Sequence, residues 1–230
     1  MLSYMKVFKG ARKIEREDVI KNKYLMNAYK KDLKNYRIMN LNHILKNGWQ
    51  NDIPGYILKF INEHKEVLLI ANIVLNQITQ IQVRSIEEKN FTVMGKQTSV
   101  PYGLGMLSRD FKYGDWLVLV EGTSDRDALT EFYPNVVAVL SDGISMVQSK
   151  LIENLTNRVL ILYDNDKEGK KGYYRDKRKL EYMGMEVERF ELPEDVGDPG
   201  RLLELRFKGK FFEAENLENY FESWFESILS

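Results

Sequence analysis

Three acidic residues follow two apolar runs of this chain, and together they can hold a metal ion. Glu121 directly follows the run 116–120, and Asp164 and Asp166 follow the run 158–163. Consecutive Val, Leu and Ile residues are typical of strands in a parallel sheet covered on both faces. Because open α/β sheets bind ligands at the carboxyl ends of their strands, we expect the three carboxylates to lie together there. Oxygen ligands without His or Cys suit Mg²⁺ or Mn²⁺, which predicts metal-assisted phosphoryl chemistry.

Glycines and spacing support the same interpretation. Gly122 directly follows Glu121, where a residue without Cβ permits a sharp turn and close approach to a phosphate. Asp164 and Asp166 are two residues apart, so at a strand end they can bind one ion or span two. Asp and Glu also cap helices that follow strands, so each acid taken singly has a structural alternative. Three acids at two strand ends favour a site.

From Asp115 onward the pattern alternates between strand and helix. Strands are expected at 116–120, 136–140, 158–163 and 185–190, and helices at 123–132, 144–156 and 168–182. Alternation at this spacing predicts a parallel sheet with right-handed crossovers. The acidic, aromatic-rich end of the chain, residues 206–230, is expected to form an amphipathic helix.

The first part of the chain has a different character. Residues 1–50 carry 12 Lys and Arg against 4 Asp and Glu, which is typical either of a surface that binds a polyanion or of a solvated helical face. Residues 1–66 are expected to be mainly helical, with apolar residues at helical spacing over Tyr24–Met39. The runs 66–75 and 78–86 predict a β-hairpin, followed by a loop that contains Gly95 and Lys96.

Composition excludes several classes of protein. The 230 residues include no cysteine, which excludes disulfides and thiolate zinc sites, and His43 and His64 have no metal-like surroundings. The sequence has no run of eighteen apolar residues, so no membrane span is predicted. The N-terminus lacks the apolar core of a signal peptide. A cytoplasmic protein with no membrane partner and no zinc is expected.

The two acidic motifs resemble those of the toprim domain, which DnaG-type primases, topoisomerases and some nucleases share. The motifs are Glu121-Gly-Thr-Ser-Asp125 and Asp164-Asn-Asp166-Lys-Glu-Gly169, and the resemblance covers about residues 115–205. It implies that Glu121, Asp164 and Asp166 surround catalytic Mg²⁺ or Mn²⁺, with Asp125 as a further acid. Asp198-Pro-Gly200 is similar to the Asp-Pro-Asp segment of DnaG-type primases, with glycine at the third position, and implies a metal contact from Asp198.

Residues upstream of the motifs resemble the N-terminal half of the DnaG-type primase polymerase core. The resemblance rests on the strand pair that contains Arg84, a basic loop, and the segment 102–105. It implies that Arg84 and Lys96 bind template or nucleotide, while Lys167 and Lys170, after the second motif, are placed to neutralise phosphates. The implied fold class is α/β: a toprim parallel sheet flanked by helices, preceded by a mixed α+β basic N-terminal subdomain. The expected division is 1–114, 115–205 and 206–230.

The resemblance implies a DNA primase core that makes short RNA primers by metal-dependent nucleotidyl transfer. Single-stranded DNA and ribonucleoside triphosphates are the implied partners, with a replicative helicase and a separate zinc-binding or template-recognition protein. The compact size is similar to that of the polymerase portion of phage primase–helicases, so a phage or mobile-element origin is expected. Two alternatives stay open: a toprim metal-dependent nuclease, and a non-catalytic nucleic-acid-binding replisome protein.

Overall fold

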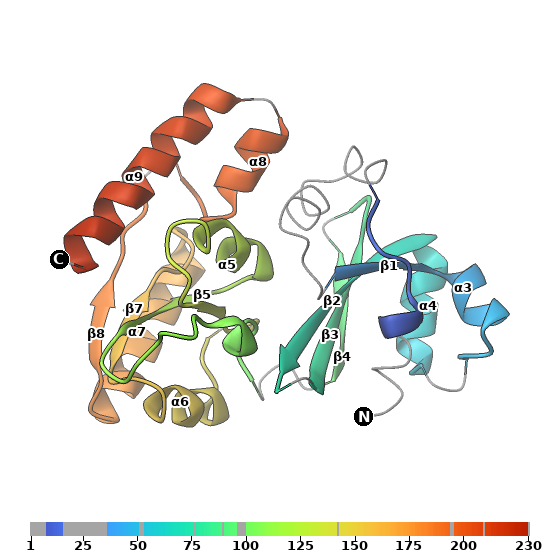
Figure 1. Cartoon of the computed structure of the whole chain (residues 1–230), viewed down its shortest axis with the longest axis horizontal. Helices are drawn as coiled ribbons and strands as arrows, with labels where there is room; N and C mark the ends of the chain where they lie inside the picture. Colours follow the sequence, from blue (N-terminus) through green and yellow to red (C-terminus); the bar gives the residue numbers. More distant parts are fainter. Residues whose placement is uncertain are drawn as a thin grey trace. The chain divides into compact units, whose positions relative to one another are not determined.

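The structure, a computed structural model, divides the chain into two compact units, residues 1–97 and 98–230 (Figure 1). The described residues are 8–15, 36–50, 53–75, 77–88, 90–95, 100–141, 143–193, 196–208 and 210–229. Lys96 lies outside them, as do residues 24–35 of the predicted N-terminal helix.

Unit 1 contains a four-stranded antiparallel sheet in the order β1-β2-β3-β4. Its strands are β1 (Tyr36–Asn40), β2 (Glu66–Val74), β3 (Gln77–Ser85) and β4 (Phe91–Gly95). The predicted hairpin is confirmed, because β2 pairs with β3 from Val67 opposite Ser85 to Val74 opposite Gln77, with a register shift between Asn72 and Ile73. The loop expected around Gly95 is instead the end of β4, whose pairing partner is β3.

Two helices pack against the apolar face of this sheet. They are α3 (Leu41–Lys46), capped by the Asn40 side chain, and α4 (Gly55–Glu63). Ile57 and Ile61 of α4 pack with Leu69 and Ile81 of the sheet in one buried cluster. The helical prediction was wrong over residues 36–39, which form β1, because pairing with β2 outweighs a local periodicity that fits either state.

Unit 2 contains the parallel sheet that the apolar runs predict, in the order β6-β5-β7-β8. Its strands are β5 (Trp116–Val120), β6 (Val136–Ala138), β7 (Arg158–Ile161) and β8 (Glu186–Arg189). All three neighbouring pairs are parallel, so the carboxyl ends of β5 and β7 lie at one edge of the sheet, side by side. The residues that follow these two strands are those of the two acidic motifs.

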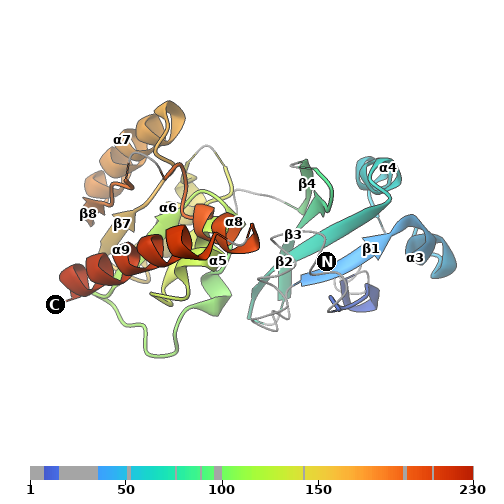
Figure 2. The same cartoon turned by 90° about the horizontal axis from the view of Figure 1, so that it is seen from above.

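Helices cover both faces of the parallel sheet (Figure 2). They are α5 (Thr123–Leu129), α6 (Met146–Glu153), α7 (Lys167–Tyr182), α8 (Arg201–Phe207) and α9 (Phe211–Leu229). On one face, Ile152 of α6 and Leu180 of α7 pack with Leu119 of β5. On the other face, the Phe221 ring of α9 lies 5.5 Å from that of Phe132, after α5. The helix expected over residues 206–230 is confirmed by α9, and its apolar side packs on the core.

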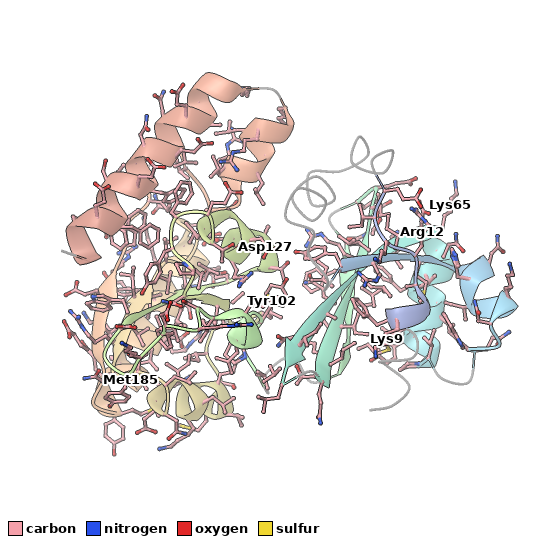
Figure 3. All side chains as sticks on the ribbon, in the orientation of Figure 1. Lys9, Arg12, Lys65, Tyr102, Asp127 and Met185 are labelled. Carbon is pink, nitrogen blue, oxygen red and sulfur yellow. The ribbon has the colours of Figure 1, made fainter. Side chains whose placement is uncertain are left out.

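The segment around Tyr102 belongs to unit 2. Tyr102 is labelled in Figure 3. Its amide donates to the carbonyl of Ala138 in β6 at 2.8 Å, and the Ala138 amide donates back to the Tyr102 carbonyl at 2.9 Å. Gly103 follows with a φ of +90°, and a Cβ there would lie 2.6 Å from Arg126 Nε, so glycine is required. Residues 98–114 are thus grouped with the parallel sheet, whereas the sequence motifs place a boundary at 114; the functional subdivision of the chain stays a prediction.

Within the described parts of the chain, no helix combines the length and the apolar character that crossing a membrane requires.

A substitution at Gly169 tests how closely α7 approaches the end of β7. A Cβ at this position would overlap the carbonyl oxygen of Asp164. We expect Gly169→Ala to lower the free energy of unfolding of unit 2 by about 1–3 kcal/mol, because backbone must shift to relieve the overlap. Urea unfolding of the full chain measures the change.

Gly197→Ala is the matched control, because a Cβ at Gly197 meets no atom within 4 Å. This control is expected to stay within about 0.5 kcal/mol of the parent chain. Equal stability of the two variants would contradict the close approach.

Candidate metal and nucleotide site

Glu121 joins the two acidic motifs. It follows the last residue of β5, and its Oε1 accepts a hydrogen bond from the backbone N–H of Asp164 at 3.3 Å. The bond crosses from the end of β5 to the end of β7, which are adjacent in the sheet. The parallel pairing therefore brings the two predicted motifs together.

Asp125 is the most deeply buried of the predicted acids, with 6% of its surface exposed. Its Oδ2 accepts from the Gly122 N–H at 2.9 Å, which caps the start of α5. Its Oδ1 accepts from the Gly200 N–H at 3.0 Å. Asp198 lies close enough to the same carboxyl group to be one of the causes of its raised pKa. Asp125 therefore ties the first motif to the segment around Asp198.

Asp164 and Asp166 occupy different environments at the end of β7. Asp164 is half-buried, whereas Asp166 is exposed and caps α7, its Oδ1 accepting from the Gly169 N–H at 2.8 Å. Asn165, between them, donates from its side chain to the carbonyl of Leu192 at 3.2 Å, and its backbone N–H donates to the carbonyl of Gly197 at 2.8 Å. The second motif is thus also attached to the segment that leads to Asp198.

The crowding of these acids changes their proton affinity. Burial, followed by the charge of Asp125 and then that of Glu121, Asp198 and Asp166, raises the pKa of Asp164 from 3.8 to about 8. Burial and the charge of Asp198 raise the pKa of Asp125 from 3.8 to about 7, against the lowering effect of its two backbone donors. Like charges in partial burial disfavour ionisation, so the acids at this edge of the sheet hold their protons to a higher pH than isolated acids do.

The carboxylates at this edge of the sheet are the kind of ligand that a divalent cation prefers. Their side chains do not have the arrangement of a metal site. The five acids offer hard oxygen ligands and an excess of negative charge, which Mg²⁺ and Mn²⁺ prefer. Over the described ranges, however, no three His, Cys, Asp or Glu side chains already have the arrangement of a metal site. Several of the carboxylate oxygens accept backbone N–H groups instead. Binding a cation therefore requires these side chains to turn toward it.

The predicted basic residues are distributed over both units. Lys167 and Lys170 are exposed in the first turn of α7, next to Asp166. Arg84 is half-buried on β3 of unit 1, its guanidinium carbon 6.0 Å from the centre of the Phe91 ring. Lys96 lies outside the described residues. The roles assigned to these basic residues and to the acids stay predictions.

Sequence reasoning missed two polar residues that support the second motif. The motifs assign no role to Asn165, although it donates to the carbonyls of Leu192 and Gly197. Asp176 of α7 is fully buried and accepts from the hydroxyl of Tyr163, the residue before Asp164. A signal for Asp176 was available, because it lies three residues after Tyr173 and four before Leu180, on the apolar side of α7.

Comparison with known proteins agrees with the resemblance. Residues 118–203 match the family model described as "Toprim-like". A DNA primase of Clostridium acetobutylicum is 30% identical over 111 residues, which are 48% of this chain and 18% of that protein. The chain therefore corresponds to a small part of that curated relative.

Solved primases share the fold. The Aquifex aeolicus primase structure, with zinc-binding and RNA polymerase domains, has a TM-score of 0.65 at 21% identity, covering 93% of this chain and 59% of that one. The RNA polymerase domain of Mycobacterium tuberculosis DnaG has a TM-score of 0.53 at 15% identity, covering 84% and 65%. The E. coli primase catalytic core has a TM-score of 0.52 at 22% identity, covering 64% and 51%. The predicted fold class is confirmed.

The raised pKa values predict that stability depends on pH when no divalent metal is present. In the folded chain Asp164 and Asp125 hold protons up to about pH 8 and 7, whereas in the unfolded chain they release them near 3.8. Their contribution to stability is therefore complete below about pH 4 and is lost as the pH rises through 7 and 8. We expect the melting temperature in EDTA to fall from pH 6 to pH 9.

The variant Asp164→Asn is the control for this pH series, because its amide keeps the shape and cannot ionise. We expect a smaller decrease of the melting temperature in this variant than in the parent chain. Parallel pH curves for the two proteins would disprove the carboxylate crowding.

Proposed function

From a toprim domain set in the fold of a DnaG-type primase core, we propose that this chain is a DNA primase core. It joins ribonucleotides on a single-stranded DNA template. The observation that carries the proposal is the set of toprim acids gathered at one edge of the sheet. Burial and the neighbouring acids raise the pKa of Asp164 there to about 8. The likeness to primase cores, which extends over both units, supports it.

The acids have separate tasks in this proposal. Glu121, Asp164 and Asp166 hold Mg²⁺ or Mn²⁺, and buried Asp125 with half-buried Asp198 forms one edge of the site. When bound, the cation orients a nucleoside triphosphate and neutralises charge that develops on its phosphates. The 3′-hydroxyl of the preceding nucleotide is the nucleophile, so the protein needs none of its own. The exposed ammonium groups of Lys167 and Lys170 contact triphosphate oxygens.

Unit 1 has the charge for a polyanionic partner. The excess of Lys and Arg over residues 1–50 supports binding of single-stranded DNA through its phosphates. The structure of a DnaG primase catalytic domain bound to single-stranded DNA, 21% identical to this chain, is consistent with such a partner. In this proposal Arg84 contacts template or nucleotide.

Other partners follow from the proposed role. A zinc-binding or template-recognition protein supplies the function that a chain without cysteine does not perform with thiolates. A replicative helicase supplies single-stranded template, and the protein acts where replication takes place, in the cytoplasm of the cell or of a phage host. We propose both partners because primer synthesis needs a recognised, single-stranded template.

Primer synthesis by the Asp164→Ala variant tests the proposal. Purified protein is incubated with single-stranded DNA, labelled ribonucleotides and Mg²⁺ or Mn²⁺, and the products are separated on a gel. We expect labelled short RNA from the parent chain and a loss of at least about 10²–10³-fold in the variant, because the acid acts on charge in the transition state. The variant should stay folded, since removing a crowded carboxylate relieves repulsion.

Asp110→Asn is the matched control, because Asp110 is an exposed acid of the same unit outside the motifs. It is expected to synthesise primers at the parent rate. Shortened DNA without label would instead identify a nuclease, and full synthesis by the Asp164→Ala variant would refute the metal assignment.

Salt titrations of single-stranded DNA binding test Arg84. We expect Arg84→Ala to weaken binding and to reduce the slope of log K against log salt by about 0.7, the value for one phosphate contact on a single strand. Lys59→Ala, which removes an exposed cation from α4, is expected to leave the slope unchanged. Equal slopes for parent and Arg84→Ala, with circular dichroism showing both folded, would remove Arg84 from the interface.

A further inference from the structure

We propose that Asp176 is a positioning residue, which fixes the end of β7 through Tyr163 and so places the side chain of Asp164. Asp176 lies seven residues beyond Gly169, the last residue of the second motif, and its hydrogen bonds go to Ile144, Tyr163 and Arg175 rather than to the motif carboxylates. The proposal rests on the proposed function, because the position of Asp164 matters when it holds a cation or substrate.

The Asp176 carboxylate is fully buried, with 0% of its surface exposed, yet it is surrounded by donors. Its Oδ2 accepts from the Ile144 N–H at 2.8 Å and from the Tyr163 hydroxyl at 3.0 Å. Its Oδ1 accepts from Arg175 Nε at 3.0 Å and lies 3.7 Å from the Lys179 ammonium. A buried carboxylate is tolerated where it is paired and hydrogen-bonded, as it is here.

Tyr163 links the buried Asp176 carboxylate to the site. It directly precedes Asp164 in the chain, and its ring is buried in the cluster between the sheet and α7. Its hydroxyl donates to the Asp176 carboxylate, which links the residue before Asp164 to α7. A Cβ at Gly172 would lie 3.3 Å from Tyr163 Cδ2, so the glycine lets α7 approach the ring.

The same carboxylate also reaches the connection after β6. Gly143 has a φ of +145°, and a Cβ there would overlap the Arg175 guanidinium and lie 2.5 Å from Asp176 Oδ2. Lys179 Nζ donates to the carbonyl of Ile144, next to the amide that Asp176 binds. Asp176 therefore joins α7 both to the connection after β6, through Ile144, and to the end of β7, through Tyr163.

In this arrangement Asp176 is an outer hydrogen-bond partner that supports Asp164, the proposed metal ligand. The carboxylate does not face the cation, but it fixes the backbone from which Asp164 extends. Removal of such outer hydrogen-bond partners costs about 10- to 100-fold in metal affinity or activity. A merely structural role would lower stability and leave metal affinity unchanged.

The test compares two tyrosine variants of the full chain, Tyr163→Phe and Tyr133→Phe. Both remove one buried hydroxyl from unit 2, but the Tyr133 hydroxyl donates to the carbonyl of Trp116, at the opposite end of β5. Mn²⁺ affinity is measured by paramagnetic titration, and hydrogen exchange is measured over residues 158–170. We expect Mn²⁺ affinity about tenfold weaker and exchange faster in Tyr163→Phe. We expect neither change in Tyr133→Phe.

Equal Mn²⁺ affinity and equal exchange in the parent chain and Tyr163→Phe would overturn the proposal, whatever the melting temperatures. A parent chain that binds Mn²⁺ and makes no primers would reject the primase function, while the difference between the two tyrosine variants would still support positioning. Asp176→Asn is expected to change Mn²⁺ affinity in the same direction as Tyr163→Phe, and unchanged affinity in a folded Asp176→Asn protein would count against the proposal.

Discussion

The constraint on which the rest of unit 2 depends is the repulsion between carboxylates at one edge of the sheet. Burial and the charges of four neighbours together raise the pKa of Asp164 to about 8. Such an arrangement disfavours folding unless protons or cations compensate it. The surrounding structure must therefore hold the acids together against their own repulsion, and the ligand that relieves the repulsion is the one that the site is suited to bind.

The acids are held together mostly by strand pairing and by hydrogen bonds from backbone N–H groups. Parallel pairing of β5 with β7 sets the two motifs side by side, and the Asp164 N–H donates to Glu121. Asp166 caps α7, which begins against Asp164 because Gly169 has no side chain. These bonds already occupy oxygens of Glu121 and Asp166, so under the proposed function a bound cation would exchange backbone donors for coordination. That exchange explains why acids gathered together do not yet form a metal site.

The sequence predicted what depends on continuous local signals. The apolar runs of β5 and β7 and the acids that follow them predicted the parallel sheet and its site-bearing edge. It did not predict β1 or β4, because the short runs around Ile38 and Val93 become strands only through pairing with β2 and β3. Asp176 and Asn165 were missed because a polar residue shows its partners only after the chain has folded. Local periodicity cannot report contacts between distant residues.

Gly200 shows how a departure from a family pattern can follow from its neighbours. In the primase segment that it resembles, an acid stands at this position, yet a Cβ here would lie 2.8 Å from Asp125 Oδ1 and 2.9 Å from Asp198 Oδ1. The Gly200 N–H donates to Asp125, and the approach that permits this bond leaves no space for a side chain. A third acid would also add charge beside Asp125, whose pKa burial and the charge of Asp198 already raise. The glycine is thus explained by the closeness of Asp125 and Asp198 to the backbone at this position.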